Sequence, residues 1–244
     1  MNTHTKSTEN MEIYLTPTYF VDSDHPDIIE WANEVVGDAK SDVEKAIRLY
    51  YDVRDGVFYN PYRVKLTKEW LKASATLTRG RSFCVPKAMV LAAGARAVGI
   101  PSKLGYANVR NHVTSQKLLD ALQSDVFAFH GYVELFLDGS WVKVSPTFNE
   151  LLCDRAGIEP LEFDGKNDAL SQEYNLEGNR FMEFITDHGT FSDFPYDKFI
   201  EEWQRVYPHL FEGENAMDYD GDFMSELAEE RTKREEVGGH FKVA

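Results

Sequence analysis

The chain has 244 residues, 43% of them apolar and 27% charged, so it is long enough to bury a core and is neither disordered nor fibrous. The 26 Lys and Arg against 41 Asp and Glu give a formal net charge of −15, which disfavours nucleic acid and anionic membranes as partners. Two cysteines, Cys84 and Cys153, exclude a disulfide scaffold. No apolar leader and no apolar window of about 18 residues is found, so we expect a cytoplasmic protein without a membrane-spanning helix.

Two helices are expected near the start. The first covers about 27–36, with Pro26 before it and Gly37 after it. The second begins at Ser41, which forms a capping box with Glu44. A short strand is expected at 57–62 and a short helix at 67–74.

The next segment, FCVPKAMVLAAGARAVGIP, predicts a helix from Cys84 to about Val98 that is buried on all sides. Only Lys87 and Arg96 are charged within it, and Gly99 and Pro101 end it. A strand at 102–110 and a short helix within 114–123 are expected to follow.

The clearest β pattern is a hairpin in the segment VFAFHGYVELFLDGSWVKVSPTF, with Asp138-Gly139 as its turn. A two-residue loop makes Leu137 face Ser140, so that Tyr132 faces Ser145 and His130 faces Thr147. A three-residue loop would instead turn the second strand over.

Beyond residue 150 the pattern is less regular, apart from a helix at 196–206 and a helix within the charged segment 213–238. We therefore expect a polar N-terminal tail at 1–20, one domain at 21–210, and an acidic, helical C-terminal tail at 211–244.

Cys84 is a candidate nucleophile because it begins the buried helix. The N–H groups and positive dipole of a helix start favour a thiolate, and Lys87 adds positive charge nearby. The alternative is a small buried core residue, the commoner role of a single cysteine.

His130 is the candidate proton carrier, because it lies on the hairpin next to Gly131 and an imidazole can accept and return a proton near neutral pH. The alternative is a hydrogen-bonded core histidine. His112 competes for the catalytic role but lies in a polar, irregular stretch.

The order of these segments resembles the transglutaminase-like superfamily, within the broad papain-like group of cysteine enzymes. The matching segments lie within about 45–147 and are KAIRLYYDVRDGVFYNPY, GRSFCVPKAMVLAAGARAVGIP and HGYVELFLDGSWVKVSPT. The resemblance implies an α+β fold in which a cysteine-headed helix packs on an antiparallel sheet. It also implies a Cys-His-Asp triad, with Cys84 as nucleophile and His130 as general base and acid.

The chain departs from the family pattern at the third position, where Ser145 replaces the aspartate. A serine can orient the imidazole but brings no charge to stabilise its cation. Asn149 shares the face of His130 if the strand continues, so it is the preferred substitute. Asp154 and Asp164 are candidates only if a loop folds back.

The expected function is therefore cysteine-dependent acyl transfer or hydrolysis of an amide or peptide through a thioester. Water as acceptor would give a peptidase or amidase, and an amine would give a transglutaminase-type transfer. The expected substrate is a peptide, a protein or an amine-bearing small molecule. No residue spacing indicates a cofactor or metal. The alternative is a catalytically inactive domain that binds a peptide or protein in the former cleft.

Overall fold

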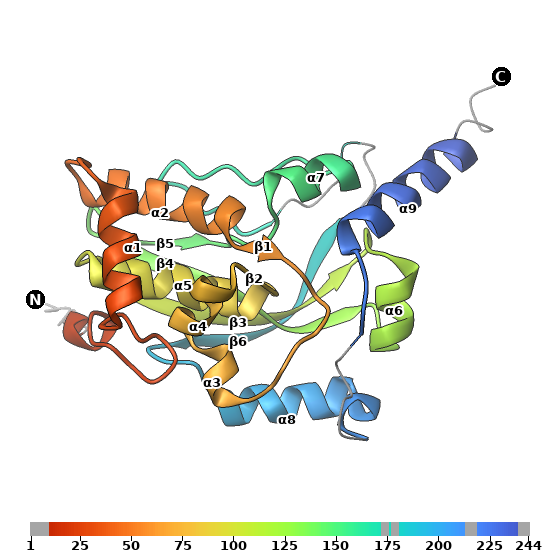
Figure 1. The fold of residues 1–244 in the computed structure, drawn as a ribbon, viewed down its shortest axis with the longest axis horizontal. Coiled ribbons are helices and arrows are strands. Elements are labelled where there is room, and N and C mark those ends of the chain that lie inside the picture. The colour runs from red at the N-terminus through yellow and green to blue at the C-terminus, as the bar shows by residue number, and fades with distance from the viewer. Residues whose placement is uncertain (1–9, 172–175, 177–180, 213–218, 239–244) are drawn as a thin grey trace, which may run out of the picture.

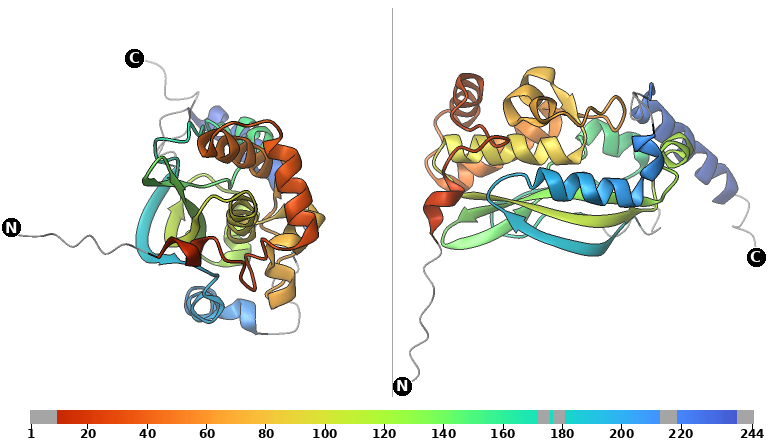
Figure 2. Two further views of the ribbon diagram at one scale, coloured as in Figure 1. Left: turned by 90° about the vertical axis from the view of Figure 1, so that its left-hand side faces the viewer. Right: turned by 90° about the horizontal axis from the view of Figure 1, so that it is seen from below.

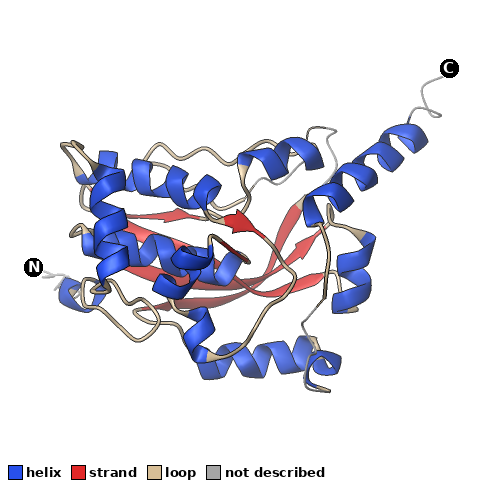
Figure 3. Ribbon diagram, viewed as in Figure 1, coloured by secondary structure: helices blue, strands red, loops and turns tan. Residues whose placement is uncertain are grey.

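The computed structural model describes residues 10–171, 176, 181–212 and 219–238. Figures 1 and 3 show its helices and strands, which in chain order are η1 (Met11–Tyr14), α1 (Pro26–Val36), α2 (Asp42–Gly56), β1 (Phe58–Tyr59), α3 (Lys68–Leu71), α4 (Ala73–Arg79), β2 (Arg81–Ser82), α5 (Cys84–Ala97), β3 (Ser102–Asn111), α6 (Gln116–Leu122), β4 (Val126–Leu137), β5 (Ser140–Val144), α7 (Glu150–Ala156), β6 (Met182–Phe191), α8 (Tyr196–Val206), η2 (Pro208–Phe211) and α9 (Phe223–Gly238). Within these residues no helix is both long enough and apolar enough to cross a bilayer.

The main sheet has four antiparallel strands in the order β5-β4-β3-β6. Helices gather on one side of it, as the right-hand view of Figure 2 shows. This mixture of helices with an antiparallel sheet confirms the predicted α+β class.

Helix α5 lies in the interior, as its composition predicts. Every residue from Cys84 to Arg96 is buried. The small residue Gly94 allows α1 to approach closely, because a Cβ atom at this position would lie 2.5 Å from the Trp31 ring. The hydrophobic core therefore surrounds the helix that carries the cysteine.

The predicted hairpin register is confirmed. Leu137 pairs with Ser140 and Glu134 pairs with Lys143 across a two-residue turn. Asp138 and Gly139 both have positive φ angles, 47° and 84°, as this class of tight turn requires. The second strand is shorter than expected, however, because β5 ends at Val144.

The sequence reading of the remaining elements is less complete. The predicted strand at 57–62 is only Phe58–Tyr59, and the predicted helix at 67–74 is two helices, α3 and α4. Strand β6 and helix α7 were not predicted. Strand β6 carries irregular pairing to β3 and mixed side chains, so it lacks a clean alternation.

The C-terminal segment contains the expected helix, α9, although 213–218 and 239–244 lie outside the described residues. This helix is packed against the domain rather than fully solvated. Leu227 is 1% exposed, and the Phe223 ring contacts Tyr59 and Tyr62.

Candidate active site

Cys84 is the first residue of α5 and is 7% exposed. The backbone amides of Gly131, Val85 and Cys84 itself lie close enough to lower the pKa of its thiol. The sulfur therefore lies where a helix start and strand β4 both present amide donors, as a site that stabilises negative charge requires.

Burial nevertheless outweighs these donors. Desolvation raises the pKa of Cys84 to about 11, although the three amides and the charge of Lys87 lower it. The helix start and Lys87 thus favour the thiolate, as expected, but burial outweighs them and the thiol is protonated at neutral pH in this state. Burial was the missing factor, because composition predicts a buried helix but not how deeply its first residue lies.

Strand β4 reaches the start of α5 through Gly131. A Cβ atom on Gly131 would lie 3.1 Å from Cα of Val85, 3.3 Å from Cβ of Ala88 and 3.4 Å from the carbonyl oxygen of Cys84. A glycine is thus needed for the strand to pack this closely on the first helical turn. The backbone beside His130 is consequently in contact with the cysteine.

His130 itself is 4% exposed, and its ring lines a narrow cavity of about 10 Å³ together with Ser145 and Thr147. Cys84 is not among the residues that line this cavity. Successive strand residues point to opposite faces, and Gly131 is the residue that faces α5. In the described part of the chain no hydrogen bond joins the imidazole to the thiol.

Burial lowers the pKa of His130 to about 4. The imidazole is therefore neutral at physiological pH and is in the form that accepts a proton.

Ser145 lies on the His130 side, as the register predicts, but just beyond the end of β5. Its hydroxyl shares a hydrogen bond of 2.8 Å with the Thr147 hydroxyl, and its backbone N–H donates to the carbonyl of Ala169. Ser145 and His130 thus line the same cavity without a direct hydrogen bond between them in the described structure.

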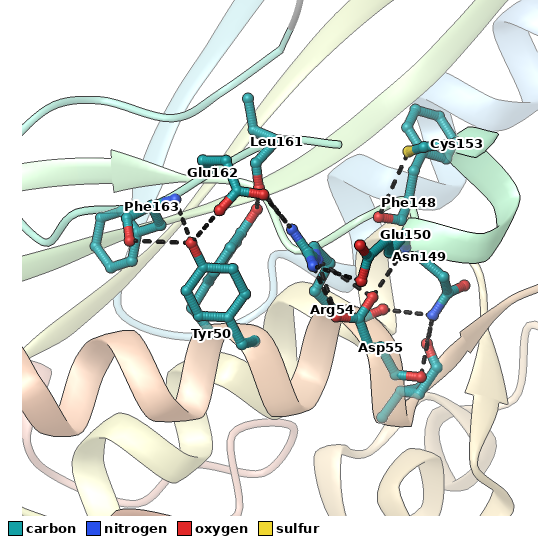
Figure 4. Close-up of polar contacts among 12 residues, drawn as sticks. Tyr50, Arg54, Asp55, Phe148, Asn149, Glu150, Cys153, Leu161, Glu162 and Phe163 are labelled. Atoms are coloured by element: carbon teal, nitrogen blue, oxygen red, sulfur yellow. Dashed lines mark hydrogen bonds and ion pairs between the residues drawn. The ribbon is translucent and has the colours of Figure 1, made fainter. Parts of the chain in front are cut away.

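Asn149 has a different position from the one expected. The strand does not continue to it, because β5 ends at Val144 and Asn149 precedes the first turn of α7. Its amide oxygen accepts from the N–H of Tyr59 at 2.6 Å, and its Nδ2 donates to the Arg54 carbonyl. Figure 4 shows this amide beside Asp55 at the end of α2. The premise that placed it beside His130 is therefore wrong, and its amide holds α2, β1 and α7 together.

The other candidates also lie apart from His130. His112 is 3.6 Å from Glu183 in a partly exposed ion pair. Asp164 accepts hydrogen bonds from Lys166 and Asn167 within its own loop. The backbone carbonyl of Asp154 accepts a hydrogen bond from Arg231 of α9. In the described structure no hydrogen bond joins the side chain of His112, Asp154 or Asp164 to the His130 ring.

Lys87 has a role that sequence reasoning missed. It is fully buried. Its Nζ donates to the carbonyls of Arg54 and Val57 at the C-terminal end of α2, where the Asn149 amide also binds. Desolvation lowers its pKa to about 7. A single lysine inside an apolar helix was the available signal, since a buried ammonium needs partners.

Two further observations complete the site. The Tyr106 hydroxyl is buried without a hydrogen-bond partner in the described structure, and its pKa is raised by burial and by Cys84. Within the described ranges, no three His, Cys, Asp or Glu side chains are grouped so that they could hold a metal ion.

A cysteine at the start of a buried helix, packed on an antiparallel sheet with a histidine on the adjoining strand, defines the class of fold. Residues 29–146 match the family model of the Transglutaminase-like superfamily. The predicted resemblance is confirmed, and this segment forms a transglutaminase-like core.

Two solved structures are similar to the chain. One, from Cytophaga hutchinsonii, is described as a "Putative Cysteine Protease"; it is 19% identical, covers 57% of this chain and 42% of its own, and has a TM-score of 0.45. The other, a "Putative Protease" from Parabacteroides distasonis, is 13% identical, covers 57% of this chain and 30% of its own, and has a TM-score of 0.37. This chain thus aligns with less than half of either protein. Comparison with the curated proteins finds no match.

Proposed function

We propose that the protein is a cysteine-dependent acyl-transfer enzyme that acts on an amide or peptide bond through a thioester on Cys84. The observation that carries the proposal is the position of Cys84 at the first residue of the buried helix α5, against Gly131 of β4, where the backbone amides of Gly131, Val85 and Cys84 lower the pKa of the thiol. Amides fixed near the sulfur stabilise the negative charge that develops on it as the proton leaves. The transglutaminase-like core supports the same reaction class.

His130 serves as the base in this proposal. It takes the proton from the Cys84 thiol as the sulfur–carbon bond forms, and the substrate carbonyl oxygen becomes negatively charged. The imidazolium then gives the proton to the leaving amine when the carbon–nitrogen bond breaks. Water or a second amine resolves the thioester. Because Gly131 rather than His130 faces α5, this role requires β4 to shift when substrate binds so that the ring reaches the sulfur.

Ser145 is proposed as the positioning residue in place of the family aspartate. The cavity that it shares with His130, about 10 Å³, has room for roughly one water molecule. Such a water would connect the imidazole to the Ser145 and Thr147 hydroxyls and hold the ring in one orientation. We also propose that the protein works in a reducing compartment such as the cytoplasm, because both cysteines are free thiols.

The test uses para-nitrophenyl acetate, whose acyl group transfers to a reactive thiol with release of nitrophenol. We expect the full chain to gain one acetyl group on Cys84, detected by mass spectrometry of the intact protein. Cys84→Ala must abolish the adduct. Cys153→Ala is the matched control, because Cys153 is also buried and burial raises its pKa to about 12. Acetylation that persists in Cys84→Ala contradicts the proposal.

A second candidate function is a catalytically inactive domain that binds a peptide or protein. It is favoured by the engagement of Asn149 with Tyr59 and Arg54, and by the pairing of the Ser145 hydroxyl with Thr147. The same experiment separates the two functions, because a binding domain would give no nitrophenol burst.

A further inference from the structure

A cavity of about 290 Å³ lies beside the parallel pair formed by β1 and β2, the second of which directly precedes the helix that carries the candidate nucleophile. The residues that line it are Asn60, Tyr62, Arg63, Trp70, Arg79, Arg81, Ser82, Asp220 and Gly221. Ser82 is two residues before Cys84, and the intervening Phe83 ring stacks on Trp70 with 6.4 Å between centroids. In Figure 1, β1, β2, α3 and α4 gather near the start of α5. The cavity is therefore connected to the candidate nucleophile by only two residues of the chain, from Ser82 to Cys84.

The cavity is positively charged although the protein has a net charge of −15. Three arginines line it against one carboxylate, Asp220, which is paired with Arg63 at 2.8 Å. Arg79 and Arg81 have no carboxylate partner in the described structure. A positive site on an acidic protein concentrates anions locally, because its field is not cancelled by the residues around it.

Arg79 is rigidly held. Its guanidinium lies over the Trp70 ring at 3.8 Å, and its Nε and both terminal nitrogens donate to the carbonyls of Arg81, Trp70 and Ala75 and to the hydroxyls of Thr76 and Ser82. All of these acceptors are neutral. Desolvation lowers the pKa of Arg79 to about 10, because a half-buried cation is costly without a nearby anion.

Arg54 is a buried arginine whose charge is paired with carboxylates. It is 4% exposed and pairs with the carboxylates of Asp55 and Glu162. Arg96 is also bound by neutral acceptors, but the carbonyls of Thr16, Ser102 and Ser192 enclose it. Arg79 differs from both because it borders an open cavity that is also lined by the exposed Arg81 and the buried Ser82.

We propose that this cavity binds a carboxylate of the acyl substrate, with Arg81 and Ser82 as the contacting donors and Arg79 as the fixed charge behind them. The assignment of the ligand as a substrate rests on the proposed function, because it depends on Cys84 being the acyl acceptor. An arginine and a hydroxyl at one end of a cavity suit the planar, charged oxygens of a carboxylate. The enzyme would then prefer acidic peptides, with the carboxylate supplied by an Asp or Glu side chain or by the chain terminus.

The experiment measures binding in the full-length Cys84→Ala protein, so that no turnover is required and failure of the proposed function leaves the result readable. The probe is fluorescein-labelled tetraglutamate with an amidated C-terminus. Amidated tetraglutamine and tetraglutamine with a free C-terminus are titrated in parallel by fluorescence anisotropy. We expect tetraglutamate to bind at least about tenfold more tightly than amidated tetraglutamine, a difference typical of one charge-assisted contact.

Arg81→Ala is expected to weaken tetraglutamate binding about tenfold, and Arg81→Lys to weaken it less. Arg155→Ala is the matched control, because it removes the same positive charge from an exposed arginine outside the cavity. Tight binding of free tetraglutamine that also depends on Arg81 would identify the chain terminus as the carboxylate source. Tight binding of tetraglutamate alone would identify a side chain.

Equal affinity of all three peptides would overturn the proposal, as would equal losses in Arg81→Ala and Arg155→Ala. A second measurement keeps Arg81 in place, so that its result does not depend on whether Arg81→Ala folds. Phenylglyoxal modification of Arg81, followed by peptide mapping, is expected to slow several-fold when tetraglutamate is present. Unchanged modification would also overturn the proposal.

Discussion

At the scale of single residues, burial decides the charge states of the candidate catalytic groups. It raises the pKa of Cys84 to about 11 and lowers that of His130 to about 4, so both groups are neutral between these values. The sequence identified both residues and their elements. It could not supply their depth, because burial depends on how distant segments cover the start of α5.

The depressed pKa of His130 has a consequence for stability. In the unfolded chain an imidazole titrates near 6.5, so the unfolded state binds the proton first as the pH falls. The contribution of His130 is therefore fully present above pH 6.5 and is lost as the pH falls toward 4. We expect a loss of about 3 kcal/mol in the free energy of unfolding from this residue.

The measurement is urea unfolding of the wild type and His130→Gln at pH 7 and pH 4. The variant should lose less stability between the two pH values, because glutamine does not titrate. Parallel losses in the two proteins would mean that His130 is not held neutral by burial.

At the scale of elements, the sequence predicted those parts whose pattern is local. The N-cap at Ser41 is confirmed by the hydrogen bond from the Glu44 N–H to the Ser41 hydroxyl at 3.2 Å, whereas the Glu44 carboxylate accepts from the Lys40 N–H and not from the Ser41 N–H of a full capping box. The hairpin register followed from the Asp138-Gly139 turn alone. Helix α7 and strand β6 were missed because their positions are set by packing with segments far away in the chain.

Asn149 illustrates that limit. Its expected place beside His130 assumed that β5 continued, whereas the chain turns into α7 and the amide binds the end of α2. No local sequence pattern predicts a hydrogen bond between residues that are 95 positions apart.

We predict that Asn149→Ala lowers the free energy of unfolding by about 2–3 kcal/mol, because it leaves buried N–H and carbonyl groups without partners. The acetylation rate of the folded fraction should stay the same. Asn33→Ala is the control, since the Asn33 amide makes an exposed bond to the Ile29 carbonyl within its own helix. A large fall in acetylation at unchanged stability would instead make Asn149 the residue that orients His130.

At the scale of the whole molecule, the fold brings a helix start and a hairpin strand together across the core. Gly131 provides the contact, and the transglutaminase-like match over residues 29–146 spans both elements. The family resemblance predicted this meeting of segments, and composition alone would not have done so. The cavity proposed to bind a carboxylate belongs to this scale too, because Arg63, the Arg79–Arg81 segment and Asp220 are brought together only by the tertiary structure.

The central claim is that the Cys84 thiol and the His130 imidazole act together, and the rate of Cys84 acetylation at pH 7 tests it most directly. Acetylation of the wild type and of His130→Gln is followed by mass spectrometry of samples quenched at successive times. Unfolding curves confirm that the two proteins have equal folded fractions. General-base assistance predicts that the variant reacts about 100-fold more slowly or worse. Equal rates in the two proteins would contradict the account.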